Sequence, residues 1–307
     1  MKTPITTAVI SVAGLGTRMG TFTEGVPKFM SPVYAGDQAR PVIDYVIDEC
    51  LGAGVTNLIF VVSDGGEAVL RGYLGPVSQV RAEQLTAQVA RDPKKQLQLD
   101  KELTRRAAFA GIDITYVEQP VGPYGTAVPL SLVRPLLQER GIDYCIFITG
   151  DDFLWRPDGR SEWADALENW DGHRSIIMGD DVALEDASRY GILQGTDDGN
   201  LVRIVEKPPA DQVPKNPTRN ISRYLIGPGL WPFIDAEMRR NPEANQPEHY
   251  VTDAINNAVA AGETFKIHRI TSAYLDCGTP RSALAAGIYI TGKLDKHQAL
   301  ATANTQV

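Results

Sequence analysis

Cysteine, histidine and net positive charge are all scarce in this chain. Its 307 residues include three cysteines, Cys50, Cys145 and Cys277, and this odd, widely spaced set provides neither a disulfide framework nor a zinc-binding spacing. Acidic residues outnumber basic ones by 38 to 30, which gives a formal net charge of −8. Because a nucleic-acid binder that relies on phosphate contacts usually carries excess positive charge, that class of protein is disfavoured. An acidic protein can still bind nucleotides when its basic groups gather in one cleft.

Long hydrophobic runs are also missing. No apolar stretch approaches the roughly 20 residues that a membrane-spanning helix needs. The N-terminus carries one lysine and then a short apolar segment that glycines and Arg18 interrupt, which makes a poor signal peptide. With 43% hydrophobic and 22% charged residues, the chain has the composition of a globular protein with a large core. We therefore expect a soluble, cytoplasmic protein.

The chain begins with a motif that favours phosphate binding. Residues 7–13 read as a buried strand, Gly-Leu-Gly-Thr-Arg follows at 14–18, and Pro-Lys stands at 27–28. A strand that leads into a glycine-rich turn points several backbone N–H groups at one place, and two nearby cations favour a polyphosphate there. Met19 stands where a dinucleotide fingerprint needs its third glycine, and no Gly-Lys-Ser/Thr follows as in a Walker loop. For this motif alone, a plain tight turn is the alternative interpretation.

Strands and helices alternate along the first 75 residues, which predicts an α/β fold with a doubly wound, mostly parallel mixed sheet. The polar, helix-prone residues 78–109 predict a helical insertion. The expected strands are 7–13, 57–63, 112–118, 144–149, 175–179, 191–194 and 201–205, and the expected helices are 41–50, 67–74 and 250–261.

Several polar residues follow expected strands. In open α/β sheets, ligands bind beyond the carboxyl ends of the strands, so the glycine turn, Gln119 and Asp151 are expected to converge. Two carboxylates with phosphate oxygens and water form a typical Mg²⁺ site, and we assign them to Asp151 and Asp276. Adjacent side chains on an extended chain point in different directions, so only one of Asp151 and Asp152 is expected to bind the metal. The sequence favours Asp151, which directly follows a glycine, and leaves Asp152 open.

A further charged motif, Glu206-Lys207-Pro208, follows the expected strand 201–205. One interpretation is a solvated charge pair before a loop. The other is a carboxylate that binds sugar hydroxyls beside a cation that binds a phosphate. The spacing alone does not separate the two.

Taken together, these motifs resemble those of the sugar-1-phosphate nucleotidyltransferases. Within that family the likeness is to the bacterial UTP–glucose-1-phosphate uridylyltransferases, also called UDP-glucose pyrophosphorylases. It extends over about residues 6–290 and includes the helical insertion. The motifs that carry it are Gly-Leu-Gly-Thr-Arg at 14–18, Pro27-Lys28, Gln119, Gly150-Asp151, Tyr190-Gly191, Glu206-Lys207-Pro208 and Asp276.

The resemblance implies one Rossmann-like catalytic domain over 1–295, with a nucleotide-binding half to about 155, a sugar-binding half beyond it, and a flexible tail at 296–307. It implies transfer of a nucleotidyl group from a nucleoside triphosphate, UTP by default, to a sugar 1-phosphate, glucose 1-phosphate by default. Mg²⁺ would be the cofactor, pyrophosphate the second product, and a homo-oligomer (dimer or tetramer) the assembly. The implied roles are nucleotide binding for Ala13, Gly14, Gly16, Thr17, Gln119 and Gly125, catalysis for Arg18, Lys28 and Lys207, sugar binding for Tyr190, Gly191 and Glu206, and metal binding for Asp151 and Asp276.

Some residues depart from the family's pattern. Gly-Pro-Tyr-Gly-Thr at 122–126 replaces a shorter loop beside the base, so dTTP or GTP stay open as substrates, as does another sugar or cyclitol phosphate. Phe29 stands where an acidic residue is common in the uridylyltransferases. Two other classes remain as alternatives. A glycosyltransferase that consumes a nucleotide-sugar needs no triphosphate loop, and a non-catalytic relative usually lacks the arginine, lysine or aspartates that this chain has.

Overall fold

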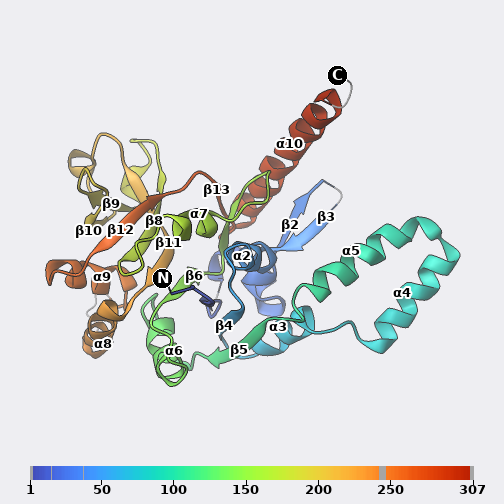
Figure 1. Cartoon of the computed structure of the whole chain (residues 1–307), viewed down its shortest axis with the longest axis horizontal. Helices are drawn as coiled ribbons and strands as arrows, with labels where there is room; N and C mark the ends of the chain where they lie inside the picture. Colours follow the sequence, from blue (N-terminus) through green and yellow to red (C-terminus); the bar gives the residue numbers. More distant parts are fainter. Residues whose placement is uncertain (1–2, 15, 37, 242–246, 305–307) are drawn as a thin grey trace.

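The computed structural model describes residues 3–14, 16–36, 38–241 and 247–304, and it confirms the α/β fold class (Figure 1). Among the described residues, nine strands form one central sheet in the order β10-β9-β11-β6-β1-β4-β5, with β8 paired to β11 and β12 paired to β8. Its strands are β1 (Thr7–Ser11), β4 (Asn57–Val62), β5 (Asp113–Glu118), β6 (Cys145–Thr149), β8 (Ser175–Asp181), β9 (Gly191–Gly195), β10 (Leu201–Glu206), β11 (Thr218–Ile226) and β12 (Phe265–Arg269).

Helices cover both faces of this sheet (Figure 1). One hydrophobic cluster packs α2, α3, α7 and α10 against the sheet, and a second cluster packs α6, α8 and α9 against the other face. The helices are α1 (Phe22–Gly25), α2 (Val42–Leu51), α3 (Gly66–Leu74), α4 (Gln79–Arg91), α5 (Gln96–Ala107), α6 (Val128–Glu139), α7 (Glu162–Glu168), α8 (Trp231–Arg239), α9 (Val251–Ala260) and α10 (Pro280–Asn304).

The N-terminal half of the sheet is parallel. Strands β6, β1, β4 and β5 pair in parallel, as their alternation with helices predicted. Both faces are covered, so β1 is apolar on both sides: Ala8 and Ile10 join one cluster, and Val9 joins the other. Because the strands are parallel, their carboxyl ends lie at one edge, where the predicted site residues follow them.

The second half of the sheet is mixed, with β12 parallel to β8 and the other pairs antiparallel, and the sequence predicted less of it. Strand β11 pairs antiparallel with β6, β8 and β9, yet no strand was expected at 218–226. A separate two-stranded ribbon joins β7 (Asp152–Trp155) to β13 (Ala273–Asp276). A hairpin pairs β2 (Pro32–Ala35) with β3 (Gln38–Pro41).

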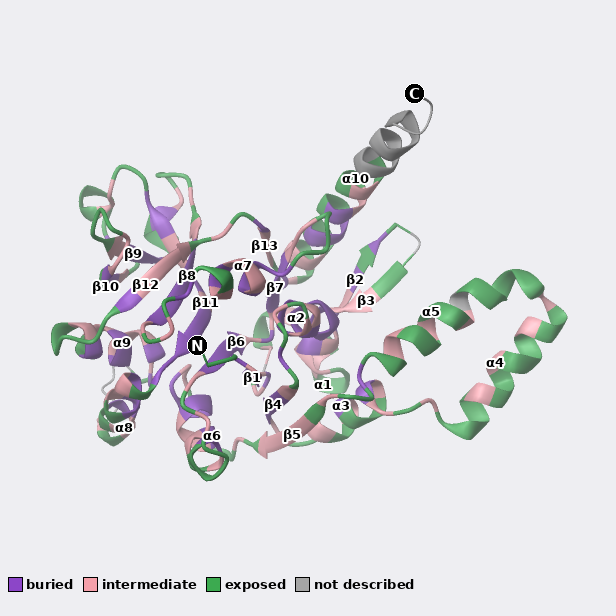
Figure 2. Cartoon of the chain, viewed as in Figure 1, coloured by how far each residue is buried: buried purple, intermediate pink, exposed green. Residues whose placement is uncertain are grey.

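The helical insertion is confirmed as an antiparallel arm of α4 and α5 that protrudes from the body (Figures 1 and 2). None of its described side chains is buried. Its base is held by Arg105, whose guanidinium donates to the carboxylates of Asp44 and Asp48 on α2 at 2.5 Å. Arg106 adds a hydrogen bond to the Gly75 carbonyl at 2.6 Å.

The C-terminal helix α10 also projects from the body (Figure 1). It extends to Asn304, so it includes most of the stretch from 296 that was expected to form a tail. Among the helices of the described residues, none is long and apolar enough to cross a membrane.

Candidate active site

The glycine turn after β1 is fixed by the backbone of Gly16. This residue has φ of 65°, which favours glycine, and a Cβ there would lie 2.9 Å from Thr23 Cγ2 and 3.1 Å from Lys28 Cβ. Gly16 therefore brings the turn against the segment that carries Lys28. Gly14 is exposed, and Leu15, also part of the motif, lies outside the described residues.

Arg18 and Thr17 lie on η1 (Thr17–Met19), and both are exposed. The guanidinium of Arg18 lies beside Asp276, because a Cβ on Gly278 would come within 3.2 Å of Arg18 Nη2 and 2.8 Å of Asp276 Oδ1. The structure thus brings together the arginine of the first motif and the aspartate of the last, which are far apart in the sequence.

Lys28 pairs with Asp151. The Lys28 ammonium, on η2 (Lys28–Met30), lies 2.6 Å from Asp151 Oδ2, and the two side chains are 10% and 36% exposed. Asp151 follows β6, so this ion pair joins the second motif to the strand end where an acidic residue was predicted.

Asp152, the alternative metal ligand, faces the interior. Its Oδ1 accepts from Arg223 Nη1 at 2.5 Å and its Oδ2 accepts from Tyr274 Oη at 2.6 Å. Burial raises its pKa to about 7, although Arg223 opposes this effect. Arg223 is itself fully buried and also donates to both carboxylate oxygens of Glu49 at 2.9 Å. Both oxygens of Asp152 are therefore occupied inside the protein, whereas the Asp151 side chain is 36% exposed.

Asp276 ends β13 and is exposed. It opposes Asp152 in the β7–β13 ribbon, and its Oδ1 accepts the Gly278 N–H at 2.8 Å. Burial, with the nearby charges of Asp276, Asp152 and Asp151, raises the pKa of the Cys277 thiol to about 12, so both predicted ligands lie near that thiol. The described residues contain no group of three or more histidine, cysteine or carboxylate side chains suited to a metal. A cation held by Asp151 and Asp276 would thus take further oxygens from its ligand.

The loop at 122–126 is tied to the start of α9. Gly125 has φ of 123°, and a Cβ there would lie 2.3 Å from the His249 carbonyl oxygen, so only glycine fits. His249 N donates to the Tyr124 carbonyl at 3.0 Å, and Thr126 Oγ1 accepts the Val251 N–H at 3.0 Å. The buried His249 segment thus packs directly on the loop that contains Gly125, a contact that no sequence motif predicted. Gln119, the predicted base reader, follows β5 and is partly buried.

The predicted sugar-binding residues lie close together where β10 pairs with β9: Glu206, Lys207 and Gly191. Glu206 pairs with Gly191 across β10 and β9, and a Cβ on Gly191 would lie 2.7 Å from Glu206 Oε2. The carboxylate thus lies over a position that only glycine leaves open. Lys207 has φ of 45°, a strained backbone for a residue with a side chain, and its N–H donates to the Tyr190 carbonyl at 3.0 Å. Such strain is common at ligand sites.

Arg219 of β11 lies between Tyr190, beside the predicted sugar-binding residues, and Tyr274 of β13. Its guanidinium lies 4.7 Å from the ring centroids of both Tyr190 and Tyr274, and it donates twice to Asp180 Oδ2, at 2.6 and 3.0 Å. Tyr190 adjoins the predicted sugar site, and Tyr274 holds Asp152 next to the predicted metal site. No motif in the sequence marked Arg219, because it lies on a strand that was not predicted.

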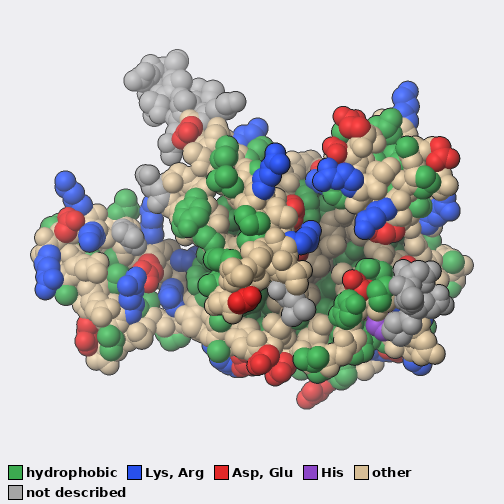
Figure 3. All heavy atoms as spheres, turned by 180° about the vertical axis from the view of Figure 1, so that it is seen from behind, with side chains coloured by type: hydrophobic (Ala, Val, Ile, Leu, Met, Phe, Trp, Pro, Cys, Tyr) green, Lys and Arg blue, Asp and Glu red, His purple; other side chains and the backbone are tan. Residues whose placement is uncertain are grey.

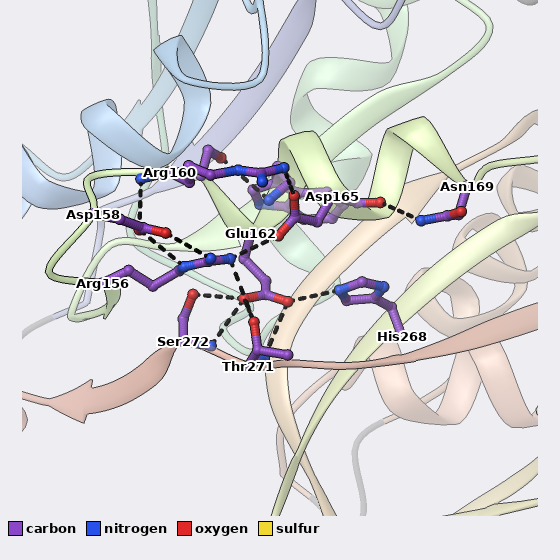
Figure 4. A network of polar contacts seen from close by, with 11 residues as sticks. Arg156, Asp158, Arg160, Glu162, Asp165, Asn169, His268, Thr271 and Ser272 are labelled. Atoms are coloured by element: carbon purple, nitrogen blue, oxygen red, sulfur yellow. Dashed lines mark hydrogen bonds and ion pairs between the residues drawn. The ribbon is translucent and has the colours of Figure 1, made fainter.

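The loop that leads into β13 is held by Glu162 of α7 (Figure 4). Its carboxylate accepts from His268 Nε2 at 2.8 Å, from the Ser272 hydroxyl at 2.6 Å and from the backbone N–H groups of Thr271 and Ser272. Burial alone would raise the pKa of Glu162, but these hydrogen bonds lower it to about 2. A buried carboxylate thereby fixes the segment that ends at Asp276.

Comparisons with known proteins identify the family of this chain. The sequence model of the family described as nucleotidyl transferase matches residues 7–291. The UTP–glucose-1-phosphate uridylyltransferase of Escherichia coli K12 is 27% identical over 287 residues, 91% of this chain and 87% of that protein. The Haemophilus influenzae enzyme of the same name is 28% identical, with 88% of each chain covered.

Solved structures show the same fold. The UTP-bound UGPase from Acinetobacter baumannii superposes with a TM-score of 0.75 at 23% identity, over 96% of this chain and 99% of that one. The family match begins at β1 and ends within α10, so it includes every motif on which the resemblance was based. This chain belongs to the nucleotidyl transferase family and is a nucleotidyltransferase.

Proposed function

We propose that this chain transfers the uridylyl group of UTP to glucose 1-phosphate, which yields UDP-glucose and pyrophosphate. The observation that carries the proposal is the pair of contacts at Lys28: its Cβ packs on the turn at Gly16 and its ammonium binds Asp151. Lys28 thus links the glycine turn, which is the expected triphosphate-binding loop, to Asp151 at the end of β6. The names of the relatives supply the default base and sugar.

The nucleotide half of the site would use the first motif. Backbone groups of Ala13 and Gly14, with Gln119, would bind the base, next to the loop that contains Gly125. Gly16 and Thr17 would bind the triphosphate through backbone N–H groups. Arg18 is exposed and would bind the β- and γ-phosphates, where it would stabilise the charge of the departing pyrophosphate.

Mg²⁺ fits the donors at the strand ends. Asp151 and Asp276 are carboxylates on neighbouring strand ends near one thiol, and carboxylate oxygens are ligands that Mg²⁺ prefers. Asp152 is not available, because Arg223 and Tyr274 occupy its oxygens. When bound, the ion would supply positive charge beside the phosphate oxygens.

The sugar half would use Glu206, Gly191, Tyr190 and Lys207. The Glu206 carboxylate, lying over Gly191, would accept hydrogen bonds from hexose hydroxyls. Lys207, whose backbone is fixed by the hydrogen bond to Tyr190, would bind the sugar phosphate. The Tyr190 ring would contact the hexose.

The reaction would be an in-line displacement at the α-phosphorus. An anionic oxygen of the sugar phosphate forms the new P–O bond, the bond to the bridging oxygen of the β-phosphate breaks, and pyrophosphate leaves with that electron pair. The nucleophile is ionised at neutral pH, so no general base is needed, in keeping with four histidines of which none lies in a motif. Lys28 and Lys207 would offset the repulsion between the two anionic substrates, and positioning would supply up to about 7–11 kcal/mol.

The test is a panel of five nucleoside triphosphates against several sugar 1-phosphates, read by pyrophosphate release in the presence of Mg²⁺. The proposal predicts that UTP with glucose 1-phosphate gives the highest kcat/KM. A preference for dTTP, GTP or a cyclitol phosphate would keep the reaction class and correct the substrate. Release from no combination would contradict the proposal.

We also propose that the chain is a homo-oligomer, a dimer or tetramer, that acts in the cytoplasm, where both substrates are made. The helical arm supports self-association, because Val80, Leu97 and Leu103 are exposed apolar side chains on a protruding element. Light scattering coupled to size-exclusion chromatography would give the molar mass, and a monomer at micromolar concentration would contradict this part of the proposal.

A further inference from the structure

Strand β11 lies where the nucleotide half of the sheet meets the sugar half. One of its edges is paired with β8. The other edge pairs first with β9, at residues 218–219, and then with β6, at residues 223–226. Residues 220–222 lie between these two partners. Because β9 begins at Gly191 and β6 is followed by Asp151, this short segment adjoins both a predicted sugar-binding residue and a predicted metal ligand.

The backbone of β11 is irregular at this junction. The register of its pairing with β8 shifts between Asn220 and Tyr224. Ser222 has φ of 54°, a strained backbone for a residue with a side chain, and its N–H donates to Asn220 Oδ1 at 3.1 Å. Irregularities of this kind redirect side chains and are common beside active sites. The irregular stretch therefore points to a role for the side chain that it holds, Asn220.

Glu206, Gly191 and Asn220 form one row across three strands. Glu206 is paired with Gly191 across β10 and β9. Ile192 is paired with Arg219 across β9 and β11, and one more step of this register sets Gly191 beside Asn220. Opposite residues of an antiparallel pair lie on the same face of a sheet. The carboxylate of Glu206 and the carboxamide of Asn220 therefore share a face, with a glycine between them that adds no side chain.

The phenol of Tyr224 holds this carboxamide in place. Tyr224 Oη accepts from Asn220 Nδ2 at 2.7 Å, and the Tyr224 ring is buried and stacked on Phe147. Burial raises the pKa of Tyr224 to about 12, and the charge of Glu206 adds to this effect, so that carboxylate also lies near the phenol. Among the residues that the structure describes, the second N–H of Asn220 Nδ2 has no partner.

The row provides both parts of a hydroxyl-binding site. A carboxylate only accepts hydrogen bonds, whereas the free N–H of the Asn220 amide donates one. A hydroxyl group between them can donate to Glu206 and accept from Asn220. Figure 3 shows charged side chains of both signs crowded over the part of the molecule that contains β9 and β10. This part of the protein therefore suits a polar ligand such as a sugar phosphate.

We propose that Asn220 determines sugar specificity by binding the 2-hydroxyl group of the hexose, which it shares with Glu206. The inference rests on the proposed function, in which hexose hydroxyls bind Glu206 and the reacting phosphate lies near Asp151. Asn220 lies between these two positions along the edge of β11. The 2-hydroxyl is on the carbon next to the one that bears the phosphate, so it is the hydroxyl that reaches this place. The substrate class is thus a hexose 1-phosphate with a hydroxyl group at that carbon.

The test compares glucose 1-phosphate with 2-deoxyglucose 1-phosphate, read by pyrophosphate release at a saturating triphosphate concentration. The parent protein should prefer glucose 1-phosphate by about 30-fold or more in kcat/KM, because the analogue leaves both the carboxylate and the amide without a partner. Asn220→Ala should lower kcat/KM for glucose 1-phosphate by about threefold to tenfold, the effect of one hydrogen bond, and should leave kcat/KM for the analogue unchanged. The folded fraction of a variant cancels in the ratio of the two substrates, so partial unfolding does not affect this preference.

A conservative variant and a control separate binding from structure. In Asn220→Asp the carboxylate can still accept from the Ser222 N–H and the Tyr224 hydroxyl, but it has no N–H to donate, so the preference should fall as far as in Asn220→Ala. Asn256→Ala is the matched control, because the Asn256 amide binds the N–H and the carbonyl of Ile204 on β10, at 2.7 and 2.9 Å. That variant should change kcat/KM for both sugars by the same factor and keep the preference.

Three results would overturn the inference. They are equal kcat/KM for the two sugars in the parent protein, an unchanged preference in Asn220→Ala (or in Asn220→Asp, where the alanine variant does not fold), and an equal fall of the preference in Asn256→Ala. Each of them leaves the proposed function in place, because glucose 1-phosphate still yields pyrophosphate. If neither sugar yields pyrophosphate with any triphosphate, the proposed function is wrong and this inference fails with it. A base other than uracil changes only the triphosphate with which the preference is measured.

Discussion

The substitution Gly16→Ala tests whether the turn after β1 is built around this one glycine. The change adds a single methyl group in a position with φ of 65°, where it would lie 2.9 Å from Thr23 Cγ2. Gly20→Ala is the matched control. Gly20 has φ of 66° in the same segment, but no described atom lies within 4 Å of its Cβ, so that variant meets the backbone cost alone.

The magnitude follows from these two terms. Gly16 has left-handed backbone, with ψ of 23°, which costs a residue with a Cβ roughly 1–2 kcal/mol. Gly20 has ψ of −151°, a region that almost only glycine adopts, and its backbone cost is about 1–3 kcal/mol. Overpacking adds about 1–3 kcal/mol, and only Gly16→Ala incurs it. Because none of the described residues of η1 or α1 is buried, the segment can shift to relieve the strain, and this cost then weakens binding of the triphosphate, which needs the native turn. We expect the Kd of UTP to rise by about 30-fold or more in Gly16→Ala, and by about fivefold or more in Gly20→Ala from the backbone cost alone.

Isothermal titration calorimetry of UTP binding measures both values. The double variant Gly16→Ala with Thr23→Ser removes the methyl group that clashes and keeps the hydroxyl that donates to the Gly16 and Gly20 carbonyls. It should recover the overpacking part of the loss and retain the backbone part. An unchanged Kd in Gly16→Ala, or no recovery in the double variant, would refute the reasoning that close packing at Gly16 shapes the nucleotide site.

Three further predictions concern the carboxylates and Arg219. Asp151→Asn should abolish Mg²⁺-dependent pyrophosphate release and leave the free energy of unfolding near that of the parent. Asp152→Asn should chiefly lower the free energy of unfolding, because it disturbs the buried pair with Arg223. If instead Asp152→Asn abolished activity and Asp151→Asn did not, the proposed metal ligand would be Asp152. Arg219→Lys should raise the KM of the sugar phosphate more than the KM of UTP, because an ammonium cannot stack on the rings of both Tyr190 and Tyr274. The control is Arg269→Lys, which alters the exposed ion pair with Asp181 and should change neither KM. The pKa of Glu162 is lowered from 4.5 to about 2, so its ionised carboxylate adds stability that is fully present above pH 4.5 and is lost as pH falls toward 2. The parent protein should therefore lose about 3 kcal/mol of unfolding free energy over this pH range that the Glu162→Gln variant does not lose. Denaturant titrations at a series of pH values measure the difference.

The parallel half of the fold could be predicted because its strands are buried on both faces. Such strands are continuous apolar runs, as at β1, β4 and β6, and α2 shows helical spacing of its apolar residues. Strand β11 could not be recognised in this way. It contains Arg219, Asn220 and Arg223, and its register shifts between Asn220 and Tyr224, so it shows neither an apolar run nor a regular alternation.

The same strand explains what the sequence could and could not say about the site. Motifs after strands predicted which residues meet, since parallel strands end at one edge. They could not separate Asp151 from Asp152, because the residues that bind Asp152 inside the protein are Arg223, 71 positions away, and Tyr274, 122 positions away. A buried cation requires compensating carboxylates, and Glu49 and Asp152 provide them. By holding Asp152 inside, Arg223 leaves Asp151 as the more exposed of the two carboxylates and so the one free to serve as the proposed metal ligand, and Arg223 lies on a strand that has no motif of its own.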